Sequence, residues 1–210
     1  VENGKPDQKP ENEEAYTREN FQRRVRNYFP AVDNTDPGND LLPFTWEKYQ
    51  AWDQAHDYAA KKRCLAQAAF HRDAASAAGL ITLYEHDKYT LKEVSHALGR
   101  INQPDGNVFL LKHVDNLKEN PYYTQLALEG LSESPGQTAF EAIIWLITQG
   151  HFSITPAVGL ELLLKLEFLA PGYLLQPGLD YDIMDAFEYI DPRSLPQHLV
   201  YFHAALPKVI

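Results

Sequence analysis

Apolar residues dominate one region in the second half of the chain, between about residues 138 and 169. Its first part has no wide polar face, because it carries Phe140, Ile143, Ile144, Trp145, Leu146 and Ile147. Its second part sets only Glu161, Lys165 and Glu167 against a run of leucine and phenylalanine. A helix that is apolar on nearly all sides is a buried helix. We therefore expect a buried antiparallel helix pair over 138–169 at the centre of the fold.

Capping residues predict where these two helices begin and end. Thr138 and Glu141 have the spacing of a capping box, in which each side chain accepts a hydrogen bond from the other residue's backbone N–H. Gly150 stands where a left-handed residue would end the first helix. Thr155 followed by Pro156 is typical of a helix start, with proline at the first helical position. A short loop is therefore expected between the two helices.

The remainder of the chain has the pattern of short helices joined by turns. Apolar positions recur at helical spacing, and segments rich in Pro, Gly, Asn and Asp separate them. Residues 80–84, Leu-Ile-Thr-Leu-Tyr, have strand propensity but lie in a helical neighbourhood. The predicted fold class is therefore all-α, either a compact multi-helix bundle or a short solenoid-like stack of antiparallel helix pairs.

Composition divides the chain into three predicted parts. Residues 1–15 are polar and acidic, so we expect a disordered tail. Residues 16–43 combine a helix with a linker of turn-forming residues, and residues 44–210 form a single all-helical domain. The N-terminal helix carries the one concentrated basic patch, Arg18, Arg23, Arg24 and Arg26. These arginines are interpreted as a solvated face that pairs with acidic neighbours, with docking of an acidic partner as the alternative.

Charge and composition narrow the class of protein. The 210 residues carry a formal charge of −10, which disfavours binding to a nucleic-acid backbone. The longest apolar region is interrupted by charges, so no stretch reaches the roughly 20 residues that span a bilayer. Cys64 is the single cysteine, which excludes an intrachain disulfide and is interpreted as a small packed residue. We expect a soluble protein, cytoplasmic or secreted, without a cofactor.

The eight histidines make a metal centre the main catalytic alternative. Adjacent histidine and aspartate can offer a nitrogen and an oxygen ligand to one divalent ion. The His86-Asp87 pair, with His56 or His71 before it, resembles the ligand order of the HD family of all-helical metal-dependent phosphohydrolases. That resemblance implies His56, His86 and Asp87 as metal ligands, a later acid such as Asp115, and phosphohydrolase activity. The pair departs from the family in being followed by lysine and tyrosine instead of a small residue or glycine.

Two further motifs fall in residues 89–99. Glu93 and His96 have the Glu-x-x-His spacing that places both side chains on one helix face in di-iron bundles, although an exposed i,i+3 pair is the simpler interpretation. The segment Tyr-Thr-Leu-Lys-Glu-Val-Ser-His-Ala-Leu-Gly also resembles the opening of a bacterial helix-turn-helix. That resemblance implies DNA binding by the following helix, in which Lys112 is the one fixed positive charge and Asp115 opposes it.

The most suggestive surface lies near the C-terminus, where acids alternate with aromatic and apolar residues between 180 and 191. An acidic rim around aromatic anchors suits recognition of a basic partner, by electrostatic steering and burial of the anchors. The alternative is an amphipathic helix whose acids only face water. The predicted partner-binding residues are Tyr181, Asp182, Asp185, Glu188 and Tyr189.

Weighing these motifs, we favour a non-enzymatic protein–protein interaction module. A regulatory adaptor, an immunity-type inhibitor and a secreted bacterial effector all fit this description. The partner is expected to be a protein with a basic surface. A metal-dependent phosphohydrolase of the HD type is the first alternative, and a helix-turn-helix DNA binder is the second.

Overall fold

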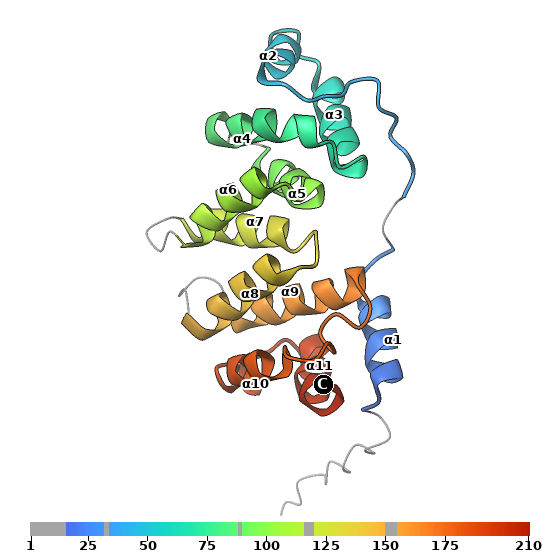
Figure 1. Ribbon diagram of the computed structural model, residues 1–210, viewed down its shortest axis with the longest axis vertical. Helices are drawn as coiled ribbons and strands as arrows, with labels where there is room; N and C mark the ends of the chain where they lie inside the picture. Colours follow the sequence, from blue (N-terminus) through green and yellow to red (C-terminus); the bar gives the residue numbers. More distant parts are fainter. Residues whose placement is uncertain (1–15, 32–33, 88–89, 116–119, 150–154) are drawn as a thin grey trace, which may run out of the picture.

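The computed structural model describes residues 16–31, 34–87, 90–115, 120–149 and 155–210 (Figure 1). Every regular element in these ranges is a helix, so the predicted all-α fold is confirmed. The α-helices are α1 Arg18–Tyr28, α2 Trp46–Gln54, α3 Tyr58–Phe70, α4 Ala77–His86, α5 Leu91–Ile101, α6 Pro104–Asp115, α7 Pro121–Leu131, α8 Gln137–Gln149, α9 Pro156–Leu169, α10 Asp180–Glu188 and α11 Gln197–Val209. Short 3₁₀ helices, Ala74–Ser76 and Pro192–Ser194, lie just before α4 and α11.

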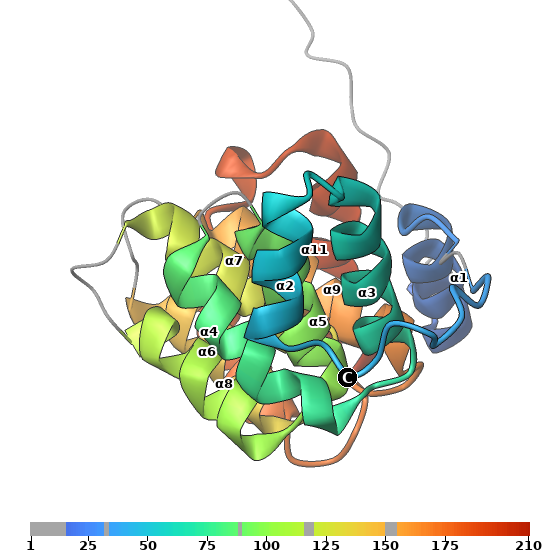
Figure 2. The ribbon, with the colours of Figure 1, turned by 90° about the horizontal axis from the view of Figure 1, so that it is seen from above.

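Helices α2 to α11 form a stack of helical hairpins, α2/α3, α4/α5, α6/α7, α8/α9 and α10/α11 (Figure 1). The even-numbered helices pack in chain order, α2 on α4, α4 on α6, α6 on α8 and α8 on α10. Among the odd-numbered helices α3 packs on α5, α5 on α7 and α9 on α11. Figure 2 shows the two rows side by side, with α4, α6 and α8 away from α1 and with α3 and α9 toward it. The arrangement is solenoid-like, because each hairpin buries its apolar faces against its neighbours.

The predicted apolar pair forms α8 and α9, which pack against each other and have other hairpins on both sides. Their inner positions are fully buried and form part of one continuous core. The largest of these buried side chains are Phe140, Ile143, Leu146, Leu160 and Leu163. The prediction of a buried helix pair from its all-round apolar pattern is therefore confirmed.

The predicted start of the second helix of this pair is confirmed, whereas the predicted start of the first helix is wrong. Thr155 caps α9 and Pro156 is its first residue, as expected. Helix α8 instead begins at Gln137, so Thr138 lies inside the first turn and the predicted capping box is wrong. Glu141 accepts a hydrogen bond from the Gln137 side chain at 2.7 Å. The predicted stop at Gly150 lies outside the described residues.

Helices α5 and α7 cross with their backbones almost in contact, and two glycines permit this. A Cβ at Gly99 would lie 1.7 Å from the carbonyl oxygen of Gly130. A Cβ at Gly130 would lie 2.5 Å from the carbonyl oxygen of Ser95. Any larger residue would push the helices apart, because backbone atoms cannot move aside as a flexible side chain can. The crossing fixes the relative positions of two helices that carry the polar cluster described below.

Helix α1 packs on α9 and α11, far along the stack from α2, which follows it in the chain (Figure 1). Phe21 is fully buried in this contact. Two arginines of the predicted basic patch also take part in the contact between α1 and α11. The Arg18 Nε donates a hydrogen bond to the Val209 carbonyl at 2.8 Å, and the Arg24 guanidinium lies 3.8 Å from the Tyr201 ring centroid. These two arginines therefore hold α1 on α11.

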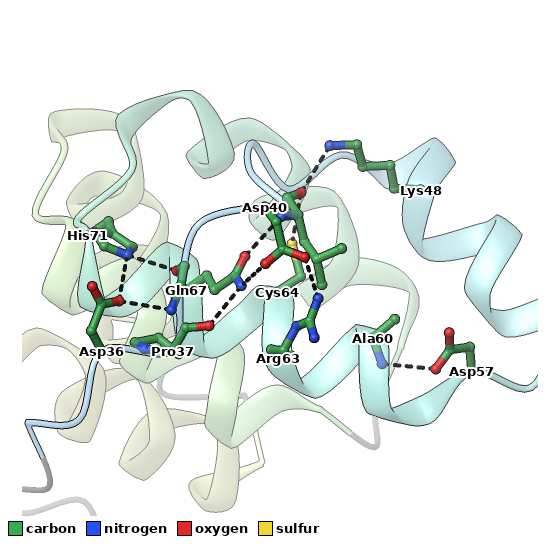
Figure 3. Close-up of polar contacts among 12 residues, drawn as sticks. Asp36, Pro37, Asp40, Lys48, Asp57, Ala60, Arg63, Cys64, Gln67 and His71 are labelled. Atoms are coloured by element: carbon green, nitrogen blue, oxygen red, sulfur yellow. Dashed lines mark hydrogen bonds and ion pairs between the residues drawn. The ribbon is translucent and has the colours of Figure 1, made fainter.

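Residues 34–45, which lead into α2, run along the stack on the side of α1 (Figure 1), and we call them the strap. Gln67 of α3 is fully buried and anchors it (Figure 3). The Gln67 amide nitrogen donates to the Pro37 carbonyl and to the Asp40 carboxylate, each at 2.9 Å. Its amide oxygen accepts from the backbone N–H of Leu41 at 3.1 Å. One buried side chain thus satisfies three polar groups of the strap, which fixes the strap against α3.

Candidate functional site

The predicted partner-binding residues all belong to α10 or its end. Tyr181, Asp182, Asp185 and Glu188 lie within α10, and Tyr189 is its C-terminal cap residue. All five are exposed, and Tyr181 is 77% exposed. Tyr189 is 56% exposed. Large aromatic side chains that stay in contact with water mark this helix as a surface that a partner could cover.

A depression of about 380 Å³ lies on this helix and gathers part of the predicted set. It is lined by Tyr181, Met184, Asp185, Phe187 and Glu188, a spacing that places them along one side of a helix. Asp182 and Tyr189 do not line it. We call the lining residues the α10 surface. The structure thus brings together three of the five predicted residues and adds Met184 and Phe187 as apolar neighbours.

The carboxylates of α10 carry unneutralised charge. Within the described part of the chain, none of Asp180, Asp182, Asp185 and Glu188 forms an ion pair. Asp180 and Asp182 lie in the first turn, where negative charge stabilises the helix dipole. Asp185 and Glu188 lie beyond that turn, so helix stability does not account for them. Their charge is available to a cation from outside the molecule.

A second site lies on the other row of helices, around a carboxylate that sequence analysis did not single out. Glu133 follows α7, and its side chain is only 5% exposed. Its Oε1 accepts a hydrogen bond from Lys165 Nζ of α9 at 2.6 Å and lies 2.8 Å from His96 Nδ1. Its Oε2 accepts from Arg100 Nε at 3.0 Å. We call Glu133, His96, Arg100 and Lys165 the Glu133 cluster, which joins α5, α7 and α9.

The charged groups of this cluster stabilise one another's ionised forms. Burial raises the pKa of Glu133, but His96 and Lys165 outweigh it and hold that pKa far below its usual range. Burial lowers the pKa of His96, but the carboxylates of Glu129 and Glu133 outweigh burial and raise that pKa above 6.5. The His96 Nε2 lies 3.6 Å from Glu129 Oε2, an ion-pair distance and not a hydrogen bond. The carboxylate of Glu133 is therefore ionised and surrounded by cations.

Two adjoining clefts meet beside this cluster at Arg100. The first, about 440 Å³, lies along the contact between α3 and α5 and is lined by Lys62, Leu65, Ala66, Ala69, Lys92, Glu93, His96, Ala97 and Arg100. The second, about 540 Å³, lies against residues of the α1–α2 connection and α9, and it is lined by Ala31, Asn34, Arg72, Arg100, Glu133 and Phe168 among others. We call the first the α3/α5 cleft. Glu93 and His96 both line it, as their spacing predicted, and His96 lies at ion-pair distance from the carboxylates of Glu129 and Glu133.

The predicted metal alternative has no assembled centre. Among the described residues, which include His56, His86 and Asp87, no group of three or more His, Cys, Asp or Glu could hold a metal ion. The ring of His86 packs on Trp46, with centroids 5.3 Å apart. The Asp87 carboxylate accepts a hydrogen bond from the Tyr49 hydroxyl. These side chains have packing roles, and the geometry offers no support for phosphohydrolase chemistry at this position.

The segment that resembles a helix-turn-helix forms two consecutive helices, α5 and α6. Asn102 ends α5 in the left-handed conformation, with φ of 54°. In α6 the exposed Lys112 is accompanied by two acids, Asp105 and Asp115. DNA binding by this segment stays an untested alternative, because helix geometry alone does not supply the basic face that a recognition helix needs.

Cys64 is fully buried, as the sequence predicted for a small packed residue. Burial raises the pKa of its thiol to about 11. The thiol therefore stays protonated near neutral pH, and a nucleophile or metal ligand would need the thiolate.

Comparison with protein-family models, curated proteins and solved structures finds no match for this chain. In the part of the chain that the structure describes, no helix is both long enough and apolar enough to cross a membrane. Function must therefore be inferred from the surfaces themselves.

The Glu133 cluster and the α3/α5 cleft had a weak signal in the sequence. Lys92, His96 and Arg100 are spaced by four residues and so share one face of α5. Glu129 and Glu133 are also four apart. Spacing shows that each set shares a helix face, but it does not show that the two faces meet. That pairing depends on the packing of α5 on α7.

Proposed function

We propose that this chain is a non-enzymatic protein-binding scaffold whose α10 surface docks a partner carrying a basic and partly apolar segment. One observation carries the proposal, namely the exposure of Tyr181 and Met184 beside the unneutralised Asp185 and Glu188. A stack of helical hairpins supports it, because such stacks present rigid extended surfaces on which partners bind.

The α10 surface has the two components of a protein interface. Tyrosine supplies a rigid apolar ring of the kind that often carries much of the binding energy. Methionine adds a flexible apolar side chain that can adapt to the partner. Carboxylates around them raise the rate of encounter with a basic partner and discriminate against acidic ones. A regulatory adaptor, an immunity-type inhibitor and a secreted effector are three uses of such a surface, and the identity of the partner separates them.

The proposal can be tested by sorting a displayed library of random peptides against the full chain. We expect the enriched peptides to combine Lys or Arg with large apolar residues. Their affinity should fall at least tenfold, or by about 1.4 kcal/mol, in the double variant Tyr181→Ala/Met184→Ala. Calorimetric titration of the chain with the selected peptides measures this change.

A matched control uses Val108→Ala/Tyr122→Ala, which removes similarly exposed side chains, 53% and 55% accessible, from α6 and α7. This control should bind the selected peptides as the unaltered chain does. The proposal fails if no peptide is enriched, or if the enriched peptides bind the Tyr181→Ala/Met184→Ala chain with unchanged affinity.

A further inference from the structure

We infer that the α3/α5 cleft is a second docking site, which takes an acidic segment of a partner protein. Its chemistry is the reverse of the α10 surface, since cations line it. The inference rests on the proposed function only in taking the occupant to be a protein, and it uses a different face of the molecule.

The cations of the cleft form a line that an extended segment could follow. Lys92, His96 and Arg100 lie along one face of α5, spaced by four residues, and all three line the cleft. Lys62 faces them from α3 across the same cleft. Four residues span about 6 Å along a helix. Carboxylates on every second residue of an extended chain repeat at about 7 Å, which approaches this spacing.

The two lysines are available to a ligand. Lys62 and Lys92 are exposed, and neither forms an ion pair with any described residue. Lys92 is near enough to Glu129 to help lower the pKa of that carboxyl, but it does not contact it as a salt bridge. Unpaired ammonium groups on both walls of a cleft favour a ligand with several carboxylates.

Arg100 is held in a position from which it could also bind a carboxylate of the ligand. Its Nε donates to Glu133, which leaves its two terminal nitrogens without a hydrogen bond to any described residue. An arginine whose side chain is fixed through Nε can present those nitrogens to a carboxylate in the bidentate geometry. The Glu133 cluster therefore acts as a support for Arg100, since Glu133 is itself held by Lys165 and His96.

The other residues that line the cleft are apolar, and most of them are small. They are Leu65, Ala66 and Ala69 of α3 and Ala97 of α5. Methyl side chains leave room for the backbone of a bound segment to approach both helices. Small apolar residues of that segment could pack on this apolar lining between its carboxylates.

Local charge decides between an acidic peptide and a nucleic acid. Lys62, Lys92 and Arg100 outnumber Glu93, which is the one acid lining the cleft. The whole chain is acidic, at −10. Beyond about 8 Å physiological salt screens that wider charge. A short segment within the cleft therefore meets mainly the unpaired Lys62 and Lys92, while Glu133 offsets part of the charge of Arg100. A nucleic acid would extend past the cleft and be repelled by the net negative charge of the chain, which would weaken its binding.

The test is a selection with a counter-selection. Random dodecapeptides are sorted for binding to the full chain, and those that also bind the Lys62→Glu/Lys92→Glu chain are discarded. We expect the remaining peptides to be enriched in Asp and Glu. By fluorescence polarisation they should bind the altered chain at least tenfold more weakly, and their Glu→Gln versions should lose affinity by a similar factor.

Two control variants make the outcome specific. Lys112→Glu/Arg193→Glu makes the same charge change at exposed positions outside the cleft and should alter affinity less than twofold. Tyr181→Ala/Met184→Ala should bind the acidic peptides normally, so the two docking surfaces can succeed or fail separately. Thermal melts check that each variant folds.

Several results would overturn the inference. The remaining peptides could lack acidic residues, or their Gln versions could bind equally well. A single-stranded DNA dodecamer or millimolar phosphate could bind with the same dependence on Lys62 and Lys92 while no acidic peptide is recovered, which would make the cleft a phosphate site. Self-association lost in the Lys62→Glu/Lys92→Glu chain would instead assign the cleft to the acidic α10 surface of a second copy. Failure of both selections would count against the proposed function as a whole.

Discussion

Single residues show how this protein tolerates buried charge. Glu167 counts as one of the few polar positions of the second apolar helix, yet it is buried to 1% exposure. Its carboxylate accepts hydrogen bonds from the backbone N–H groups of Gly172 and Leu174, at 2.6 and 3.0 Å. Glu133 is buried among cations in the same way. Each buried acid thus has partners for its oxygens, without which its desolvation would cost several kcal/mol.

The replacement His96→Gln tests the charged state of the Glu133 cluster. The pKa of His96 is raised above its unfolded value of 6.5, so its stabilising effect is complete below pH 6.5 and is lost as pH rises through the folded pKa. We expect His96→Gln to lower the free energy of unfolding by about 1 kcal/mol more at pH 5.5 than at pH 9. Urea denaturation of both chains across this range measures it. If His96→Gln lowered the free energy of unfolding equally at both pH values, His96 would be neutral throughout this range.

At the scale of elements, the sequence located helices better than it located their ends. Thr155 is the N-terminal cap residue of α9 as expected, although its hydroxyl makes no capping hydrogen bond. The Thr45 hydroxyl caps α2 by accepting from the Lys48 N–H at 3.3 Å. Thr90 stands before α5 but its hydroxyl makes no capping hydrogen bond. Thr138 lies inside α8. A capping motif shows which residues could cap a helix. The packing of the helix decides at which of them the helix begins.

The crossing of α5 on α7 is the element contact most sensitive to substitution. Gly99→Ala would place a methyl group against the Gly130 backbone, so we expect a loss of about 3 kcal/mol or more in the free energy of unfolding. Gly106→Ala is the matched control, because a Cβ there meets only ordinary contacts, at 3.5 Å or more, with Leu98 of α5. It should leave stability unchanged or raise it by up to about 1 kcal/mol. Urea denaturation measures both changes. If the two substitutions changed the free energy of unfolding equally, the close backbone contact between α5 and α7 would be contradicted.

At the scale of the whole molecule, α1 closes the stack on a partner that is distant in sequence. Phe21→Ala removes a fully buried ring that packs edge-on against Phe202, so we expect a loss of about 3–5 kcal/mol. Because hairpins in a stack contact mainly their neighbours, amide exchange should rise in α1, α9 and α11 more than in α4 and α5. Exchange that rises equally throughout would show instead that the chain unfolds as one unit.

The sequence by itself determined the all-α class, the buried pair that became α8 and α9, and an exposed acidic helix at α10. These features depend on periodicity and capping within one segment, which local sequence records. Tertiary structure alone decided that α1 docks on α11, that Gln67 anchors the strap, and that Glu133 meets cations from α5 and α9. These depend on contacts between segments far apart in the chain, and no local pattern in the sequence states which helix faces will meet.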